Sequence, residues 1–170
     1  MNIRRLQLNE IEKVVAVFDD YRVHFGQQSD IKATYEFIYR NVSREDAVIF
    51  IAEANEQVIG FVQLYKMLSS MKMSNLLIIN DLFLTADARG QRIGEQLMNQ
   101  AFTYGKENGY ETIYLETEKS NIAGNRLYQK LGMQIDDEHP DQPLSQSGKT
   151  LVAACETFFN ALRIRCPRIN

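Results

Sequence analysis

Cysteine, proline, histidine and tryptophan are scarce in this sequence: its 170 residues include two Cys, three Pro, two His and no Trp. Cys155 and Cys166 both lie near the C-terminal end and match neither a zinc-ligand pattern nor a disulfide framework. His24 and His139 lack the spacing of paired metal ligands. These absences predict reduced thiols, a cytoplasmic location and no bound metal.

Long hydrophobic runs and a strong charge of one sign are also absent. No stretch approaches the roughly 18 apolar residues that span a bilayer, and the charged first segment has no apolar signal region. We therefore expect no membrane partner. The 19 Lys and Arg against 22 Asp and Glu give a formal net charge of -3, which disfavours nucleic acid as a partner, because phosphate binding needs a concentrated positive field. The same balance mildly favours a cationic small molecule such as an amine.

Apolar residues make up 45% of the chain, enough for one sizeable core, and their spacing switches between the periods of strands and helices. We expect a polar, methionine-rich loop over residues 67–74, between two strands. The predicted strands cover residues 3–6, 48–52, 58–65, 76–84 and 112–117. The predicted helices cover residues 9–18, 31–43, 93–104 and 121–131. This order predicts an α/β fold with a mixed sheet.

The composition changes after Ile135, where Pro140 and Pro143 stand among acids, Ser and Gln. We therefore separate residues 1–138, the main domain, from an extension over residues 139–170. Apolar side chains recur in that extension at helical spacing, which predicts an amphipathic helix over residues 151–164, packed on the same domain or on a partner subunit. The apolar stripe consists of Leu151, Ala154, Cys155, Phe158, Phe159 and Leu162.

A short loop between the strand at 76–84 and the following helix is suited to bind an anion. Free N–H groups at a helix start and the helix dipole attract negative charge, and Gly90 and Gly94 allow the main chain to approach a pyrophosphate closely. Arg89 and Arg92 can add charge-assisted contacts. A helix start with flexible glycines is the alternative interpretation. Neither a Rossmann fingerprint nor a Walker loop is present.

This loop resembles the phosphate loop of the GNAT superfamily of N-acetyltransferases, which reads Arg/Gln-x-x-Gly/Ala-x-Gly/Ala after the fourth strand. Arg89 and Gly94 fit the pattern, and Arg92 stands where glycine is commonest.

Residues 121–133 are similar to a second segment of the same family, Asn-x-x-Ala-x-x-Leu-Tyr-x-x-x-Gly-Phe. Gly124 replaces the Ala and Met133 replaces the Phe. The resemblance covers about residues 3–135 and implies a centrally splayed mixed sheet flanked by helices, which makes residues 1–138 a GNAT-like acetyltransferase domain.

The resemblance implies acetyl-CoA as cosubstrate, with its acetyl-pantetheine arm between the strands at 82–84 and 112–117. Asn121 would contact that arm, and Tyr128 would protonate the departing thiolate. The remaining implied cofactor-binding residues are Leu82, Phe83, Leu84, Arg89, Gly90, Gln91, Arg92, Ile93 and Gly94.

Attack on a thioester requires a neutral amine, so a group must take a proton from the ammonium form. Asp81 is the candidate base, since a buried acid in an apolar strand needs a reason. A hydrogen-bonded structural acid is the alternative. Polyamine and thialysine acetyltransferases carry Glu-Asp here, and this chain has Asn80 in place of the Glu. The candidate acceptor-binding residues are Tyr21, Arg22, Phe25, Gln27 and Glu116.

Two functions remain open at this point. The first is acetyl transfer to a primary amine of a small polyamine-like, amino-acid or aminoglycoside acceptor. The second is a non-catalytic acyl-CoA-binding or sensing module. The family usually ends in a hairpin strand that often builds a homodimer, and the expected C-terminal helix departs from that pattern, so a homodimer stays open as the assembly.

Overall fold

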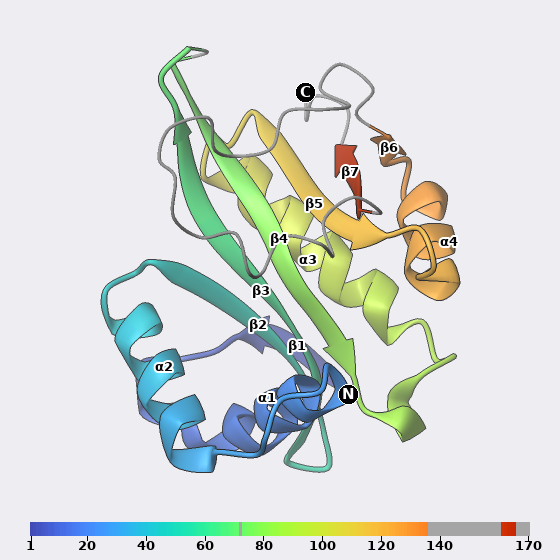
Figure 1. The fold of residues 1–170 in the computed structure, drawn as a ribbon. Helices are drawn as coiled ribbons and strands as arrows, with labels where there is room; N and C mark the ends of the chain where they lie inside the picture. The colour runs from blue at the N-terminus through green and yellow to red at the C-terminus, as the bar shows by residue number, and fades with distance from the viewer. Residues whose placement is uncertain (72, 136–160, 166–170) are drawn as a thin grey trace, which may run out of the picture.

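The computed structural model of the chain describes residues 1–71, 73–135 and 161–165 (Figure 1). Its strands are β1 (Asn2–Arg5), β2 (Ala47–Ala54), β3 (Gln57–Ser69), β4 (Ser74–Leu84), β5 (Thr112–Glu118), β6 (Gln134–Ile135) and β7 (Ala161–Arg165). Its helices are α1 (Glu12–His24), α2 (Ile31–Ser43), α3 (Ile93–Glu107) and α4 (Ile122–Lys130), with short 3-10 turns at Leu8–Glu10 and Ala86–Ala88.

All strands of the described ranges join one sheet in the order β1-β2-β3-β4-β5-β7-β6 (Figure 1). The strands β1 to β4 pair antiparallel, β4 pairs with β5 in parallel, and β7 lies antiparallel between β5 and β6. The parallel pair is connected through α3, as a parallel pair requires a crossover. The predicted α/β fold with a mixed sheet is confirmed.

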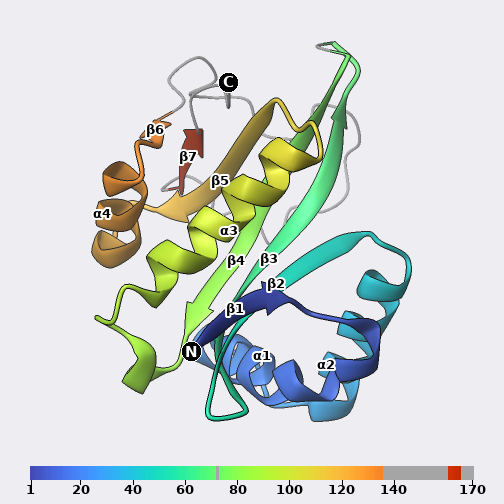
Figure 2. The same ribbon diagram turned by 180° about the vertical axis from the view of Figure 1, so that it is seen from behind.

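The two faces of the sheet carry separate cores, because successive side chains of a strand point to opposite faces. On one face α1 and α2 pack Val14, Phe18 and Ile38 against β2, β3 and β4. On the other face α3 contributes Leu97 and Met98, and α4 contributes Tyr128. Figure 2, seen from behind, shows α3 running across the face that α1 and α2 leave uncovered.

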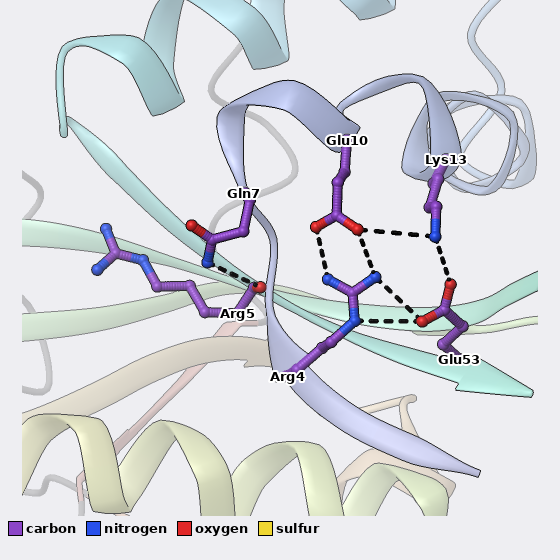
Figure 3. A network of polar contacts seen from close by, with 6 residues as sticks. All are labelled: Arg4, Arg5, Gln7, Glu10, Lys13 and Glu53. Carbon is purple, nitrogen blue, oxygen red and sulfur yellow. Dashed lines mark hydrogen bonds and ion pairs between the residues drawn. The ribbon is translucent and has the colours of Figure 1, made fainter. Parts of the chain in front are cut away.

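A charged network fixes the first strand to the start of α1 (Figure 3). The Arg4 guanidinium donates to both oxygens of Glu10, at 2.6 and 2.8 Å, and its Nη2 donates to Glu53 Oε2 at 3.0 Å. Lys13 Nζ closes the network on Glu53 Oε1 at 2.9 Å. These side chains are partly exposed, so each pair contributes little to stability, and the network serves to align β1, β2 and α1.

A β-bulge interrupts the pairing of β3 with β4. Gln63 faces Asp81 and Leu64 faces Ile79, so Asn80 has no partner on β3. Regular alternation would send Ile79 and Asp81 to the same face. The extra residue instead leaves Ile79 in the core beneath α3 and points Asp81 toward α1.

Two expectations about local structure are wrong. Half of the expected loop at 67–74 is strand: β3 continues to Ser69 and β4 starts at Ser74, so the two strands form an extended hairpin (Figure 1). The expected helix over residues 151–164 is wrong at its C-terminal end, because Ala161–Arg165 forms the strand β7. Residues 151–160 lie outside the described residues. No described helix is long and apolar enough to cross a bilayer.

Candidate active site

The strands β4 and β5 separate in the middle of the sheet. Their parallel pairing covers Leu76–Ile79 and Thr112–Leu115 and ends there, although β4 continues to Leu84 and β5 to Glu118. Figure 1 shows the two arrowheads apart. The far edge of β5 is occupied by β7. In the described part of the chain, the edge of residues 80–84 that faces β5 therefore has no strand to bond, which leaves main-chain groups available to a ligand.

The loop that follows β4 turns its backbone through two left-handed residues. Gly90 has φ of 76° and Arg92, which precedes the first residue of α3, has φ of 61°. Alternation of this kind points successive N–H groups into one concavity, and the first turn of α3 adds its own free donors. The left-handed conformation at Arg92 explains in physical terms why glycine suits this position.

Gly94 lies where the loop, β4 and α4 meet. It is buried, and a Cβ placed there would come within 3.3 Å of Leu127 and 3.6 Å of Leu84. The glycine thus keeps the start of α3 close to both elements. A larger side chain would crowd these two leucines and push the first turn of α3 away from β4 and α4.

The side chains of the loop are held mainly by its own backbone. Arg89 Nε donates to the Leu84 carbonyl at 3.2 Å, and its guanidinium lies 5.9 Å from the Phe83 ring centroid. Gln91 Nε2 donates to the Asp87 carbonyl at 2.7 Å. Arg89 and Arg92 are both exposed, so the loop presents positive charge beside the free N–H groups.

Asn121 and Tyr128 stand at opposite ends of α4. The Asn121 side chain caps the helix by accepting from Gly124 N at 3.0 Å, and it donates to Thr117 Oγ1 at 3.0 Å. A Cβ at Gly124 would come within 2.5 Å of the Asn121 amide nitrogen, so glycine permits this folded-back cap. Tyr128 is 7% exposed in the core beneath α3, and burial raises the pKa of its hydroxyl.

Asp81 is the buried carboxylate at the point of separation, 7% exposed. Tyr21 Oη of α1 donates to its Oδ1, and Asn80 Nδ2 donates to its Oδ2 at 2.9 Å. Gln63 Nε2 of β3 donates to the same Oδ2 at 3.2 Å. Burial raises the pKa of Asp81, and the bonds from Asn80 and Tyr21 oppose that rise.

An aromatic group surrounds the Asp81 side of β4. The Tyr21 ring lies 5.0 Å from that of Phe25 and 5.7 Å from that of Phe83, and His24 lies 5.2 Å from Phe25. Burial and then the charge of Asp81 raise the pKa of Tyr21, which keeps its hydroxyl protonated. Of the predicted acceptor residues, Tyr21 and Phe25 thus come together beside Asp81.

The other predicted acceptor residues are not brought to Asp81 by any described contact. Arg22 donates to Asp19 Oδ1 at 2.8 Å and to Thr34 Oγ1 at 3.2 Å, an arrangement that anchors α1 to α2. Gln27 is exposed after α1, where its backbone N–H bonds to the Arg22 carbonyl. Glu116 is exposed on β5 beyond the end of its pairing with β4.

Gln63 and Tyr65 of β3 were missed by the sequence interpretation. Gln63 is 1% exposed, and its Nε2 lies 2.5 Å from Tyr65 Oη. Burial and the charge of Asp81 raise the pKa of Tyr65 to about 12. A polar residue inside an apolar strand was the signal that singled out Asp81, and the same signal was present at Gln63.

Comparison with known proteins gives one consistent result. A family model described as the acetyltransferase (GNAT) family matches residues 14–133. An uncharacterised N-acetyltransferase of Bacillus subtilis is 35% identical over 136 residues, which cover 80% of this chain and 91% of the relative. The crystal structure of a probable acetyltransferase superposes with a TM-score of 0.79 at 26% identity, covering 88% of this chain and all of the other. A predicted acetyltransferase from Clostridium acetobutylicum, solved with acetyl-CoA, has a TM-score of 0.68 at 20% identity over 85% of this chain and 95% of its own.

Proposed function

Because the chain belongs to the GNAT family and is an acetyl-CoA-dependent N-acetyltransferase, we propose that it acetylates a small primary amine held between α1 and the separated ends of β4 and β5. The observation that carries the proposal is the placement of one buried carboxylate, Asp81, at that separation with an aromatic group beside it. The acceptor's ammonium group would meet opposite charge and aromatic faces there.

The described residues fit the cosubstrate in three places. The N–H groups of residues 90–94, at the loop and the start of α3, would hold the pyrophosphate, helped by the side chains of Arg89 and Arg92. The unpaired edge of residues 82–84 would bond the pantetheine amides. Asn121 would reach the same arm once its side chain leaves the cap on Gly124. Acetyl-CoA supplies the activated thioester.

Asp81 would act as the general base. At neutral pH the acceptor enters as an ammonium ion, and Asp81 would take one proton to leave a neutral amine. A raised pKa brings a carboxylate closer to the working pH, which makes it a better proton acceptor than an exposed Asp. The hydroxyl of Tyr21 orients the carboxylate from the acceptor side.

Tyr128 would act as the general acid. When the amine nitrogen bonds to the thioester carbonyl carbon and the carbon–sulfur bond breaks, the thiolate would receive the Tyr128 proton. The nitrogen loses its second proton as the amide forms; that proton would pass to the Tyr128 phenolate through solvent, and Asp81 would release the first proton to solvent. Asp81 and Tyr128 belong to opposite faces of the sheet, so Asp81 can act at the attacking nitrogen while Tyr128 acts at the leaving sulfur.

An amine panel with detection of free CoA thiol tests this function. Polyamines, amino acids and aminoglycosides are supplied in turn with acetyl-CoA, and we expect thiol release that depends on one of these classes. Asp81→Asn should lower kcat about 10²- to 10⁴-fold with an unchanged melting temperature. A full rate in Asp81→Asn would exclude the carboxylate as base, and thiol release that no amine increases would exclude acetyl transfer to these acceptors.

A further inference from the structure

The polar cluster behind Asp81 contains more than the proposed reaction uses. Gln63 and Tyr65 come from the middle of β3, lie on the Asp81 side of the sheet, and have no described contact that would hold a substrate. Burying an amide in an otherwise apolar strand costs free energy unless its groups are bonded. A reason for keeping Gln63 is therefore needed.

The orientation of the Gln63 amide points to that reason. Its Nε2 donates to Asp81 Oδ2 at 3.2 Å and to Tyr65 Oη at 2.5 Å, whereas its Oε1 is buried without a hydrogen-bond partner among the described residues. Leaving a buried acceptor unpaired costs free energy, so a hydrogen bond to Oε1 is not what determines the orientation of the amide. The reverse orientation would place Oε1 against the carboxylate oxygen, two acceptors face to face. An ionised Asp81 thus dictates which way the amide points.

We infer that Gln63 is a positioning residue for Asp81, whose N–H group, fixed by Tyr65, holds the carboxylate in place and favours its ionised form. This inference rests on the proposed role of Asp81 as general base. Cross-strand pairing makes the contact possible, since Gln63 stands directly opposite Asp81 on the far side of the bulge. A hydrogen bond to the charged form of an acid lowers its pKa, so the bond from Gln63 to Oδ2 acts in the same direction as the bonds from Asn80 and Tyr21, which oppose the rise that burial imposes.

Few other groups titrate near this carboxylate. Among the described residues, Tyr21 faces Asp81 from α1 and Tyr65 faces it from β3. The pKa of each phenol is raised, so both stay neutral over an assay range of about pH 5 to 9. The ring of His24 of α1 lies 5.9 Å from that of Phe83, the neighbour of Asp81 but one on β4. The acceptor's own ionisation is the same for every variant and cancels in comparisons between them.

The test is the pH dependence of kcat at saturating acetyl-CoA and amine, measured in quenched samples. Gln63→Met keeps a long side chain but removes the N–H donor, and we expect the acid limb of the profile to move up by about one pH unit. Gln63→Glu places a second carboxyl beside Asp81 and should move the limb further, because neighbouring carboxylates cannot both ionise easily. The matched control is Leu64→Met, the next residue of β3, which faces the α3 side and should leave the limb in place.

The possible outcomes separate this inference from the proposed function. If Asp81→Asn abolishes the limb and the rate while both Gln63 variants titrate like the wild type, Gln63 is structural and the inference is overturned. If Asp81→Asn keeps the full rate, the base is elsewhere and both proposals fall. If Gln63→Met does not fold, Gln63→Glu decides alone, since its protonated form has nearly the shape of the native amide. A larger shift in Gln63→Glu than in Gln63→Met supports the inference.

Discussion

Replacing Asp19 with Ala should loosen the packing of α1 beside the proposed acceptor site, because this carboxylate joins α1 to the loop and helix that follow. Asp19 is 3% exposed. Its Oδ1 accepts from Arg22 Nη1 at 2.8 Å, from Asp30 N at 3.0 Å and from Thr34 Oγ1 at 3.1 Å. Its Oδ2 accepts from Ser29 Oγ at 2.6 Å. One side chain thus organises four donors.

The free energy of unfolding that Asp19→Ala loses depends on which of the four donors can reach water once the carboxylate is removed. Breaking a buried ion pair by removing one partner costs about 3 to 5 kcal/mol. Ser29 and Asp30 are exposed and Arg22 is partly exposed, so these donors can hydrate, and only Thr34, at 2% exposure, stays buried. We therefore expect a loss of about 2 to 3 kcal/mol, below that range.

Urea unfolding measures this loss. With a slope of about 2 kcal/mol per molar, the midpoint of Asp19→Ala should fall by about 1 to 1.5 M. Asp19→Asn, which keeps one acceptor oxygen, should fall by less. The KM for the amine should rise while the affinity for acetyl-CoA stays unchanged, because α1 borders the proposed acceptor site and packs on the opposite face of the sheet from α3 and α4.

The pH dependence gives an independent check on Asp19. Hydrogen bonds from Ser29, Asp30 and Thr34 lower the pKa of this carboxyl. A lowered pKa stabilises the fold above the unfolded value of about 3.9, and that stabilisation is lost as the pH falls toward the folded value. The difference between wild type and Asp19→Ala should therefore shrink below about pH 4. Equal urea midpoints at pH 7 would refute the anchoring role.

Three further predictions concern the cosubstrate, the acid and the last strand. Tyr128→Phe should lower kcat about 10²- to 10⁴-fold with little change in acetyl-CoA affinity, and wild-type turnover with chemistry rate-limiting would exclude the general-acid role. Gly94→Asp should weaken acetyl-CoA binding in calorimetry, because its side chain would crowd Leu127 and add negative charge to the first turn of α3; unchanged affinity would contradict the phosphate site. Truncation after Gly148 removes β7 and should lower the melting temperature by at least about 3 °C or change the oligomeric state in light scattering; no change in either would make β7 dispensable.

The sequence predicted the parts of the fold that depend on local periodicity. The helix at α3 and the strands at β4 and β5 follow from regular spacing of apolar residues. The bulge at Asn80 could not be predicted, because it is defined by the register between β3 and β4, which no single segment encodes. The contact of Gln63 with Asp81 depends on that register and was missed for the same reason.

The error at the C-terminal end has a different cause. The apolar stripe from Leu151 onward has helical spacing, which predicts a helix through residue 164. Leu162 and Ile164 alternate with Arg163 and Arg165, which is the period of a strand, and β7 follows that alternation. A four-residue alternation is easily hidden by a longer helical pattern beside it, so only pairing with β5 and β6 distinguishes the two.

The position of β7 has a consequence for how the protein is made. Synthesis runs from the N-terminus, so β5 and β6 leave the ribosome before β7, which then inserts between them. Until that insertion, β5 offers an unpaired edge to any other extended chain, and such edges promote aggregation. The strands therefore cannot all pair in the order in which they are translated. Before β7 emerges, the nascent chain is exposed to mispairing, and a chaperone can bind the open edge of β5 in that interval.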